Sequence, residues 1–267
     1  MQLPFDPIRN RAQAVPLDAA QRALRAAAPP DPVTSFIIPA HNETRLIGRT
    51  IEALNAAARA HGEPYEILVV DDDSTDGTAE VAARAGARVV PVKARQIAAA
   101  RNAGARAALG DRFVFVDADT IVPAPVVRAV GEALAGGAVG GGAPARFDGR
   151  VPLWGRLGLR TWLALQKVST LASGCLLFAT RQAFEACGGF DETRFVGEDV
   201  DLSWRLRRQG RFVIIREPVV TSGRMMRTYG AFEALGLLAG LLRPGSDRRR
   251  SGHWYHKRRD DPGAIDP

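Results

Sequence analysis

The stretch Glu66-Ile-Leu-Val-Val-Asp-Asp-Asp-Ser-Thr-Asp-Gly-Thr78 indicates the fold of this 267-residue chain more clearly than any other segment. Residues 66–71 are centred on an apolar run that predicts a short buried strand, and three consecutive carboxylates lie at its end. The Ser, Asp and Gly that follow are residue types that cap helices, so we expect a helix over 78–85. A strand that passes through a capped turn into a helix is typical of α/β proteins.

The same pattern continues on both sides of this stretch. Strands are expected over Thr34–Pro39, Ala87–Val92 and Arg112–Asp117, and helices over Ile47–His61, Gln96–Leu109 and Ala124–Leu134. Apolar strands that alternate with helices predict an α/β fold with a mixed, mostly parallel central sheet and helices on both faces. Ligands of such sheets bind beyond the carboxyl ends of the strands.

Past Thr120 the spacing becomes irregular. After a Gly-rich segment at 136–142, the expected elements are a helix over Trp154–Val168, a strand over Gly174–Thr180, a helix over Glu198–Gln209, and strands over Arg211–Arg216 and Val219–Ser222. We interpret residues 33–224 as one domain with halves 33–120 and 121–224. Residues 1–32, rich in Ala, Pro and Arg, form an N-terminal extension, and residues 225–267 form a basic C-terminal tail.

The composition, 46% hydrophobic and 24% charged, fits a globular protein. Two cysteines, Cys175 and Cys187, are too few for a disulfide framework or a zinc cage. No signal peptide and no apolar run of about 20 residues is visible, so we expect a cytoplasmic protein. The net charge of +7 favours anionic partners.

Basic residues crowd the tail, beside a predicted apolar stripe; they are Arg243, Arg248, Arg249, Arg250, Lys257, Arg258 and Arg259. The stripe consists of Tyr229, Phe232, Leu235, Leu238, Leu241 and Leu242. It fits an interfacial helix that contacts anionic lipid at the inner face of the membrane. It fits equally an ordinary helix packed on the domain.

Asp117 and Asp119 stand at the end of the expected strand over 112–117. Carboxylates this close repel one another unless a cation or hydrogen-bond donors compensate them. A turn would also favour Asp at these positions. Because ligands bind at strand ends, we expect a divalent metal, Mg²⁺ or Mn²⁺, which binds proteins through one or two carboxylates plus substrate phosphates.

A second acidic group, Gly197-Glu198-Asp199-Val200-Asp201, opens the expected helix over 198–209. The helix dipole alone favours acidic residues at this end. A carboxylate at a pocket rim can equally serve as a general base. Position in the sequence does not choose among Glu198, Asp199 and Asp201.

Five segments together resemble family 2 glycosyltransferases. In chain order they are Ser35-Phe-Ile-Ile-Pro-Ala-His-Asn-Glu43, residues 66–78, Ala100-Arg-Asn-Ala-Gly104, Phe115-Val-Asp-Ala-Asp119 and Gly197-Glu-Asp199. The resemblance spans Val33 to Ser222 and implies a GT-A fold in a stand-alone, soluble member. It also implies transfer of a sugar from a nucleotide-diphosphate donor, UDP-linked, to an acceptor hydroxyl with inversion. Residues 33–120 would be the nucleotide-sugar half, and residues 121–224 the acceptor half.

On the donor side, the resemblance implies roles for single residues. Pro39, His41 and Glu43 would line the nucleotide pocket at the end of the first strand. Asp72 would hydrogen-bond the base, commonly uracil, and Arg101 would lie near the nucleotide.

The resemblance also divides the work among the acidic residues. Asp119 would bind the metal that bridges the two phosphates, and Asp117 would face the ribose or the metal shell. Asp199 would be the general base, and Glu198 would support the acceptor site.

The sequence departs from members of this family in its signatures and in its metal ligands. The Gln-x-x-Arg-Trp signature of processive polysaccharide synthases does not follow Asp199, and their membrane helices are missing, so we expect addition of single sugars. A third protein ligand for the metal is not assigned, and His253 and His256 are only candidates. The implied partners are the donor and a carbohydrate, lipid-linked or small-molecule acceptor, and not a nucleic acid.

Other functions fit parts of the pattern. A phosphohydrolase of the haloacid dehalogenase type also places Asp-x-Asp, here Asp117 and Asp119, at a strand end, although its nucleophile normally follows the first strand. A sugar nucleotidyltransferase expects a Gly-rich phosphate loop after that strand, whereas this chain has Pro39-Ala-His-Asn42. A non-catalytic nucleotide-sugar binding protein is a third alternative, against which the presence of Asp119 and Asp199 argues.

Overall fold

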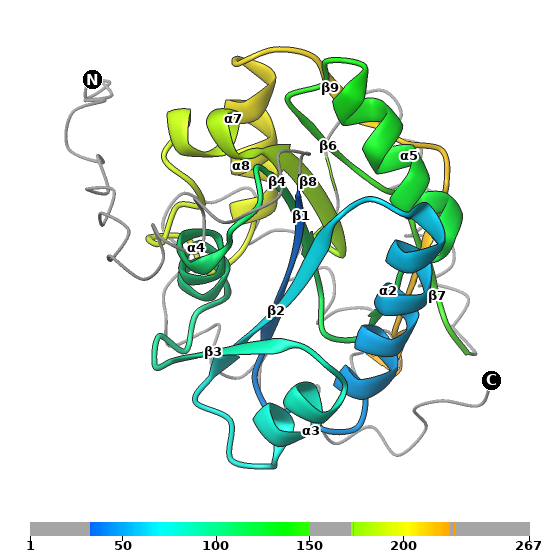
Figure 1. The fold of residues 1–267 in the computed structure, drawn as a ribbon. Helices are drawn as coiled ribbons and strands as arrows, with labels where there is room; N and C mark the ends of the chain where they lie inside the picture. Colours follow the sequence, from blue (N-terminus) through cyan, green and yellow to red (C-terminus); the bar gives the residue numbers. More distant parts are fainter. Residues whose placement is uncertain (1–32, 150–171, 173, 225–226, 228–267) are drawn as a thin grey trace.

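The computed structural model describes residues 33–149, 172, 174–224 and 227 (Figure 1). The N-terminal extension, the helix expected over 154–168 and the tail apart from Arg227 lie outside the described residues. In the ranges described, no helix combines the length and the apolar character that a membrane span requires.

A seven-stranded sheet forms the centre of the molecule. Its spatial order is β3 (Arg88–Val92), β2 (Tyr65–Asp72), β1 (Thr34–Ala40), β4 (Arg112–Val116), β8 (Leu176–Thr180), β6 (Gly140–Gly142) and β9 (Phe212–Ile214). The first four strands run parallel to one another, and β8 runs antiparallel to both β4 and β6. This order confirms the mixed, mostly parallel sheet predicted from the sequence.

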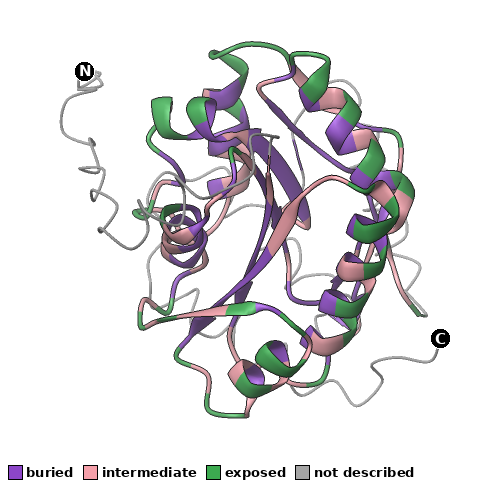
Figure 2. Ribbon diagram, in the orientation of Figure 1, coloured by how far each residue is buried: buried purple, intermediate pink, exposed green. Residues whose placement is uncertain are grey.

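Helices cover both faces of this sheet because successive strand residues point to opposite sides. Phe36 and Ile38 belong to one core cluster, with α2 (Ile47–His61), α3 (Thr78–Arg84) and α5 (Ala124–Ala135). Ile37 belongs to the other, with α4 (Ile97–Ala107), α7 (Arg181–Ala186) and α8 (Glu198–Arg207). Figure 2 shows the central strands β1, β4 and β8 buried between these two helical layers.

The irregular second half extends the same sheet. The strand expected over 174–180 becomes β8, and the strand expected over 211–216 shortens to β9. A small second sheet, which the sequence did not predict, pairs β10 (Val219–Thr221) with β5 (Thr120–Ile121) and β7 (Ala145–Phe147). This small sheet brings the end of β10 back beside the residues that follow β4.

Three non-glycine residues with left-handed backbone follow the parallel strands at one edge of the large sheet. They are Asn42 after β1, Asp73 after β2 and Arg95 after β3, with φ of 54°, 61° and 51°. Such conformations cost free energy and persist where the surrounding structure holds them, which is often at functional sites. They mark the edge at which the sequence predicts the ligand.

Gly104 allows α4 to lie directly on the sheet. A Cβ at this position would collide with Ile37 and would lie 2.8 Å from Cγ2 of Val70. Both neighbours are fully buried. Gly104 therefore sets the distance between α4 and the strands below it.

We expect Gly104→Ala to lower the free energy of unfolding by about 1–3 kcal/mol, because overpacking outweighs the gain in helix propensity. The matched control is Gly48→Ala in α2, where the new Cβ would meet Val81 at an ordinary 3.4 Å. The control should be neutral or stabilising. Urea unfolding of both variants measures the difference, and equal stability of the two would contradict the packing argument.

Candidate functional site

The loops that follow β1 and β2 are bonded to one another at the edge of the sheet. The Asn42 N–H donates to Ser74 Oγ over 2.9 Å, and the Thr75 N–H donates to Asn42 Oδ1 over 2.8 Å. Asp76 accepts from both the N–H and the hydroxyl of Thr78 at the start of α3. Burial would raise the pKa of Asp76, but its hydrogen bonds, led by those from Thr78, lower it. Asp76 therefore caps α3, as its position predicts.

Asp72 lies beneath the start of α4. Its Oδ1 accepts from the N–H groups of Ala94 and Arg95, each over 2.7 Å, and its Oδ2 accepts from the N–H of Gln96 over 2.9 Å. The carboxylate thus satisfies N–H groups of the segment that leads into α4, including that of its N-cap residue Gln96. The adjacent Asp71 has a buried Oδ1 with no hydrogen-bond partner among the described residues. Of the two, Asp71 is the one with an unused acceptor oxygen, whereas the resemblance assigns the base to Asp72.

Pro39 and His41 lie at the carboxyl end of β1. Pro39 is buried within the strand, and His41 Nδ1 lies 2.7 Å from the carbonyl oxygen of Asp72. Nδ1 would donate to this carbonyl, whereas Arg95 Nη1, 3.2 Å from the same nitrogen, would require it to accept, so the role of Nδ1 depends on the tautomer of the ring. Contact of either residue with a nucleotide stays a prediction.

Arg101 of α4 is the buried centre of the site, with 2% of its side chain exposed. Its Nη1 donates to Glu198 Oε1 and its Nη2 to Asp117 Oδ1, both over 2.9 Å, and Nη2 also donates to the Gly174 carbonyl over 3.1 Å. The Phe190 ring lies 5.2 Å from the guanidinium carbon. Burial would lower the pKa of Arg101, but Asp117 and Glu198 raise it, so the group stays charged. Arg101 therefore lies beneath the site and holds its carboxylates, whereas the resemblance places it near the nucleotide.

Glu198 and Asp199 begin α8 as a coupled pair. Burial, helped by the charge of Asp199 and opposed by Arg101, raises the pKa of Glu198 to about 7. Burial also raises the pKa of Asp199 against the effect of Arg101. The Val200 N–H donates to Asp199 Oδ1 over 2.8 Å, and a Cβ at Gly174 would lie 3.0 Å from Asp199 Oδ2. A positioned carboxylate with a raised pKa suits proton abstraction near neutral pH.

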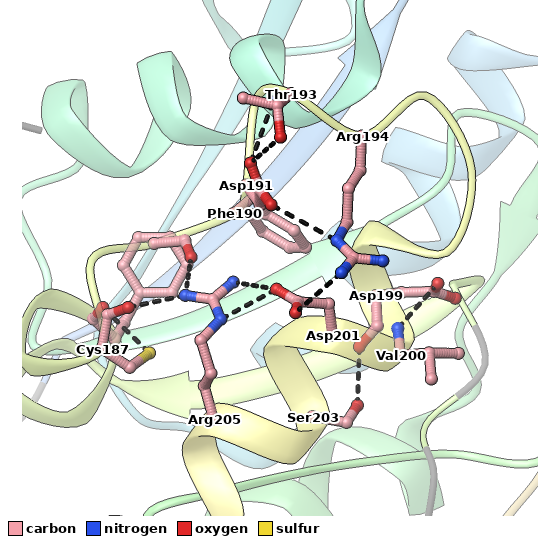
Figure 3. Close-up of polar contacts among 12 residues, drawn as sticks. Cys187, Phe190, Asp191, Thr193, Arg194, Asp199, Val200, Asp201, Ser203 and Arg205 are labelled. Carbon is pink, nitrogen blue, oxygen red and sulfur yellow. Dashed lines mark hydrogen bonds and ion pairs between the residues drawn. The ribbon is translucent and has the colours of Figure 1, made fainter. Parts of the chain in front are cut away.

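The loop before α8 is fastened to that helix by two arginines (Figure 3). Arg205 Nη1 donates to the carbonyls of Cys187 and Gly189, each over 2.6 Å, and Arg205 Nη2 lies 2.6 Å from Asp201 Oδ2. Arg194 Nη2 lies 3.7 Å from the other oxygen of Asp201. Asp201 is therefore a structural anchor of this loop.

Ion pairs distinguish Glu198, Asp199 and Asp201, among which the sequence did not choose a general base. Glu198 is ion-paired with Arg101 and Asp201 with Arg205, whereas in the part of the chain that the structure describes Asp199 forms no ion pair within 4.0 Å. Of these three acids, Asp199 is thus the one whose carboxylate is not held by an ion pair within the described residues.

Asn102, the neighbour of Arg101, ties the same loop to α4 and was not singled out from the sequence. Its Nδ2 donates to the Phe190 carbonyl over 2.9 Å and to Glu192 Oε1 over 2.8 Å, while its Oδ1 accepts from the Phe190 N–H over 2.9 Å. Gln96 Nε2 donates to the Glu192 carbonyl. The Ala-Arg-Asn-Ala-Gly segment therefore joins the two halves of the domain through adjacent side chains.

Asp119 is joined to Glu43 by a residue that sequence reasoning missed. Arg224 Nη2 lies 2.6 Å from Glu43 Oε1 and 3.0 Å from Asp119 Oδ2. The Thr221 hydroxyl donates to the other oxygen of Asp119 over 3.4 Å. Arg224 is one of 36 lysines and arginines in the chain, and its local sequence does not distinguish it from the others.

The chemistry of Asp117 and Asp119 fits a hard divalent cation, because carboxylate oxygens are the ligands that Mg²⁺ and Mn²⁺ prefer. Asp117 Oδ1 and Asp119 Oδ2 are, however, each ion-paired with an arginine. Within the described ranges, no cluster of three or more His, Cys, Asp or Glu side chains is arranged to hold a metal. The proposed third ligands, His253 and His256, lie outside the described residues.

We expect Arg101→Met to lower the free energy of unfolding by about 3–5 kcal/mol, because it leaves buried carboxylates without their cation. Arg106→Met, on the exposed side of the same helix, is the control and should have little effect. Chemical denaturation compares the two. A loss confined to about 1 kcal/mol in the Arg101 variant would contradict the central role of this ion pair.

The raised pKa of Glu198 predicts that the stability of the fold depends on pH. Between its ordinary value of 4.5 and about 7, the carboxyl ionises in the unfolded chain before it ionises in the folded one, so stability falls as pH rises. Glu198→Gln removes this titration. The stability of wild type relative to the variant should therefore fall across this range when urea unfolding is measured at successive pH values. Parallel pH profiles would contradict the prediction.

Comparison with known proteins agrees with the motifs. The glycosyl transferase family 2 profile matches residues 35–187, more than half of the chain. A beta-monoglucosyldiacylglycerol synthase from a Synechocystis strain is 28% identical over 211 residues, which cover 72% of this chain and 44% of that protein. The chain spans about half the length of the curated relatives it matches.

Solved structures resemble the fold. Glucosyl-3-phosphoglycerate synthase from Mycobacterium tuberculosis, solved with Mn²⁺, UDP-glucose and phosphoglyceric acid, has a TM-score of 0.58 at 24% identity, covering 83% of this chain and 80% of that one. A mannosyltransferase from Pyrobaculum calidifontis, solved with GDP-mannose and Mn²⁺, has a TM-score of 0.60 at 22% identity, covering 92% and 79%. The GT-A fold expected from the motifs is confirmed. With the fold, the motifs and the profile in agreement, this chain belongs to glycosyl transferase family 2.

Proposed function

We propose that this protein transfers a single sugar from a nucleotide-diphosphate sugar, UDP-linked, to an acceptor hydroxyl, with inversion at the anomeric carbon. The observation that carries the proposal is the meeting of Asp117, from the end of β4, and Glu198, from the start of α8, on the buried Arg101. Through Arg101, Asp117 on the proposed donor side is joined to Glu198, the neighbour of the proposed base Asp199. Family membership supports sugar transfer as the class of reaction.

On the donor side, Asp119 and Asp117 would hold a divalent metal, Mn²⁺ or Mg²⁺. When bound, it would neutralise the charge that develops on the departing nucleotide diphosphate. The Mn²⁺ in both solved relatives supports this part of the proposal. Pro39, His41 and Glu43 would line the donor pocket, and Asp72 and Arg101 would act chiefly by fixing the loops around it.

On the acceptor side, Asp199 would take the proton of the attacking hydroxyl. The acceptor oxygen forms a bond to the anomeric carbon on the face opposite the leaving group. The bond from that carbon to the phosphate oxygen breaks, and its electron pair stays on the diphosphate. The burial that raises the pKa of Asp199 suits it to accept a proton, and Glu198 would hold it in position through Arg101.

The acceptor is expected to be a carbohydrate, a lipid-linked or a small-molecule alcohol. The relatives differ widely in this respect, since one is named for a diacylglycerol product and another was solved with phosphoglyceric acid. The lack of a processive signature after Asp199 supports transfer of one sugar at a time.

We expect Asp199→Asn to slow sugar transfer by about 100-fold or more while nucleotide-sugar affinity is retained, because general base catalysis contributes on this scale. Asp119→Asn should instead abolish the dependence of nucleotide-sugar binding on Mn²⁺. Glu52→Gln, an exposed carboxylate on α2, is the matched control and should leave both unchanged. Calorimetric titration with UDP sugars, followed by product analysis with an acceptor panel, measures both properties.

The same measurements test the alternatives. Nucleotide-sugar binding without hydrolysis or transfer of any donor would favour a non-catalytic binding protein. Release of inorganic phosphate from phosphoesters, dependent on Asp117, would favour a phosphohydrolase. If Asp119→Asn leaves nucleotide-sugar affinity unchanged with Mn²⁺ present, the proposed donor site is wrong.

A further inference from the structure

The small second sheet holds Arg224 over the carboxylates of the donor site. In the antiparallel pairing of β10 with β5, Thr221 lies opposite Thr120, and the Ser222 N–H donates to the Asp119 carbonyl over 3.2 Å. Arg224 follows two residues later. Its position is therefore set by backbone pairing rather than by a flexible side-chain contact alone.

One guanidinium nitrogen of Arg224 contacts two carboxylates at this point, the buried Asp119 and the half-buried Glu43. Arg224 Nη2 lies 2.6 Å from Glu43 Oε1 and 3.0 Å from Asp119 Oδ2. The exposed fractions of the three side chains are 8% for Arg224, 14% for Glu43 and 3% for Asp119. Two carboxylates this near to each other require a cation between them, because removal from water strengthens their repulsion.

The cation that Asp119 binds here is thus part of the chain. A divalent ion that uses Asp119 Oδ2 as a ligand would lie at the oxygen that Arg224 already engages, where the two positive charges repel each other. Both cannot hold this oxygen at full strength. An Arg224 that gave up Asp119 would keep Glu43 as its partner but would lose its second carboxylate, a loss that a new anion would offset.

We propose that Arg224 is a resident counter-cation that competes with the divalent metal for Asp119 and is released when the diphosphate of the donor offers it a new anionic partner. This inference rests on the proposed function. The metal and the nucleotide then bind cooperatively, since each removes an obstacle to the other. By linkage, the nucleotide tightens metal binding by the same factor as the metal tightens nucleotide binding.

The inference is tested by Mn²⁺ binding to the whole protein without nucleotide, followed through the electron paramagnetic resonance signal of free Mn²⁺. Arg224→Gln should bind Mn²⁺ about tenfold or more tightly than wild type, because a charge-assisted hydrogen bond no longer occupies Asp119. Arg224→Lys keeps the charge without the planar fork and should fall between the two. Arg88→Gln, which removes a half-exposed arginine paired with Glu66, is the control and should match wild type.

Addition of UDP provides the second measurement. UDP should tighten Mn²⁺ binding to wild type markedly and to Arg224→Gln much less, because the competing ion pair is already gone. Equal Mn²⁺ affinities of wild type, Arg224→Gln and Arg224→Lys, or equal enhancement by UDP, would overturn the inference. If Arg224→Gln does not fold, the lysine variant decides alone, and affinity equal to wild type overturns the inference.

The Asp119→Asn variant separates this inference from the proposed function. If that variant loses Mn²⁺ binding while the Arg224 variants behave like wild type, the metal site stands and only the competition is wrong. If Asp119→Asn binds Mn²⁺ as wild type does, the metal is held elsewhere and the donor-site proposal itself fails.

Discussion

The buried guanidinium of Arg101 is the interaction on which the candidate site depends. It joins α4, the residue after β4 and the first turn of α8 through ion pairs with Asp117 and Glu198, both at 2.9 Å. A charge with 2% exposure is tolerable because both terminal nitrogens of the guanidinium donate to a carboxylate. Because the arginine and the carboxylates each compensate the charge of the other, these ion pairs hold the three elements in one arrangement. Asp199, which follows Glu198, is positioned as a consequence.

On the donor side, carboxylates again require a cation, and a different arginine supplies it. Asp119 and Glu43 share the guanidinium of Arg224, which the small sheet of β5, β10 and β7 holds in place. Arg101 is buried on α4, whereas Arg224 lies three residues beyond β10, the last described strand. One arginine thus stabilises the framework of the site, and the other occupies a carboxylate that the proposed chemistry requires. One site can contain both arginines because each pairs with a different carboxylate. Asp117 pairs with Arg101, and Asp119 pairs with Arg224.

Much of the fold and part of the site could be predicted from the sequence. The four parallel strands were found because apolar runs alternate with amphipathic helices, and Asp76 was recognised as a helix cap because its bonds to Thr78 are local, whereas its bond from the Thr44 N–H was not foreseen. The short strands β5, β6 and β7 were not predicted. In β6, three glycines oppose strand propensity, but a Cβ at Gly141 would collide with Val213 and Phe178, so glycine allows the strand to fit between its two neighbours. Such a constraint is invisible until the neighbouring strands are in place.

The sequence by itself determined the class of fold, the family and the edge of the sheet at which acidic residues gather, because periodicity, turn chemistry and motif order are local properties of the chain. Only the tertiary structure decided which carboxylate meets which cation. Glu198 lies 97 residues from Arg101, and Glu43 lies 181 residues from Arg224. Pairings over such separations follow from the packing of sheet and helices, and the burial that gives them their strength arises only when the chain has folded.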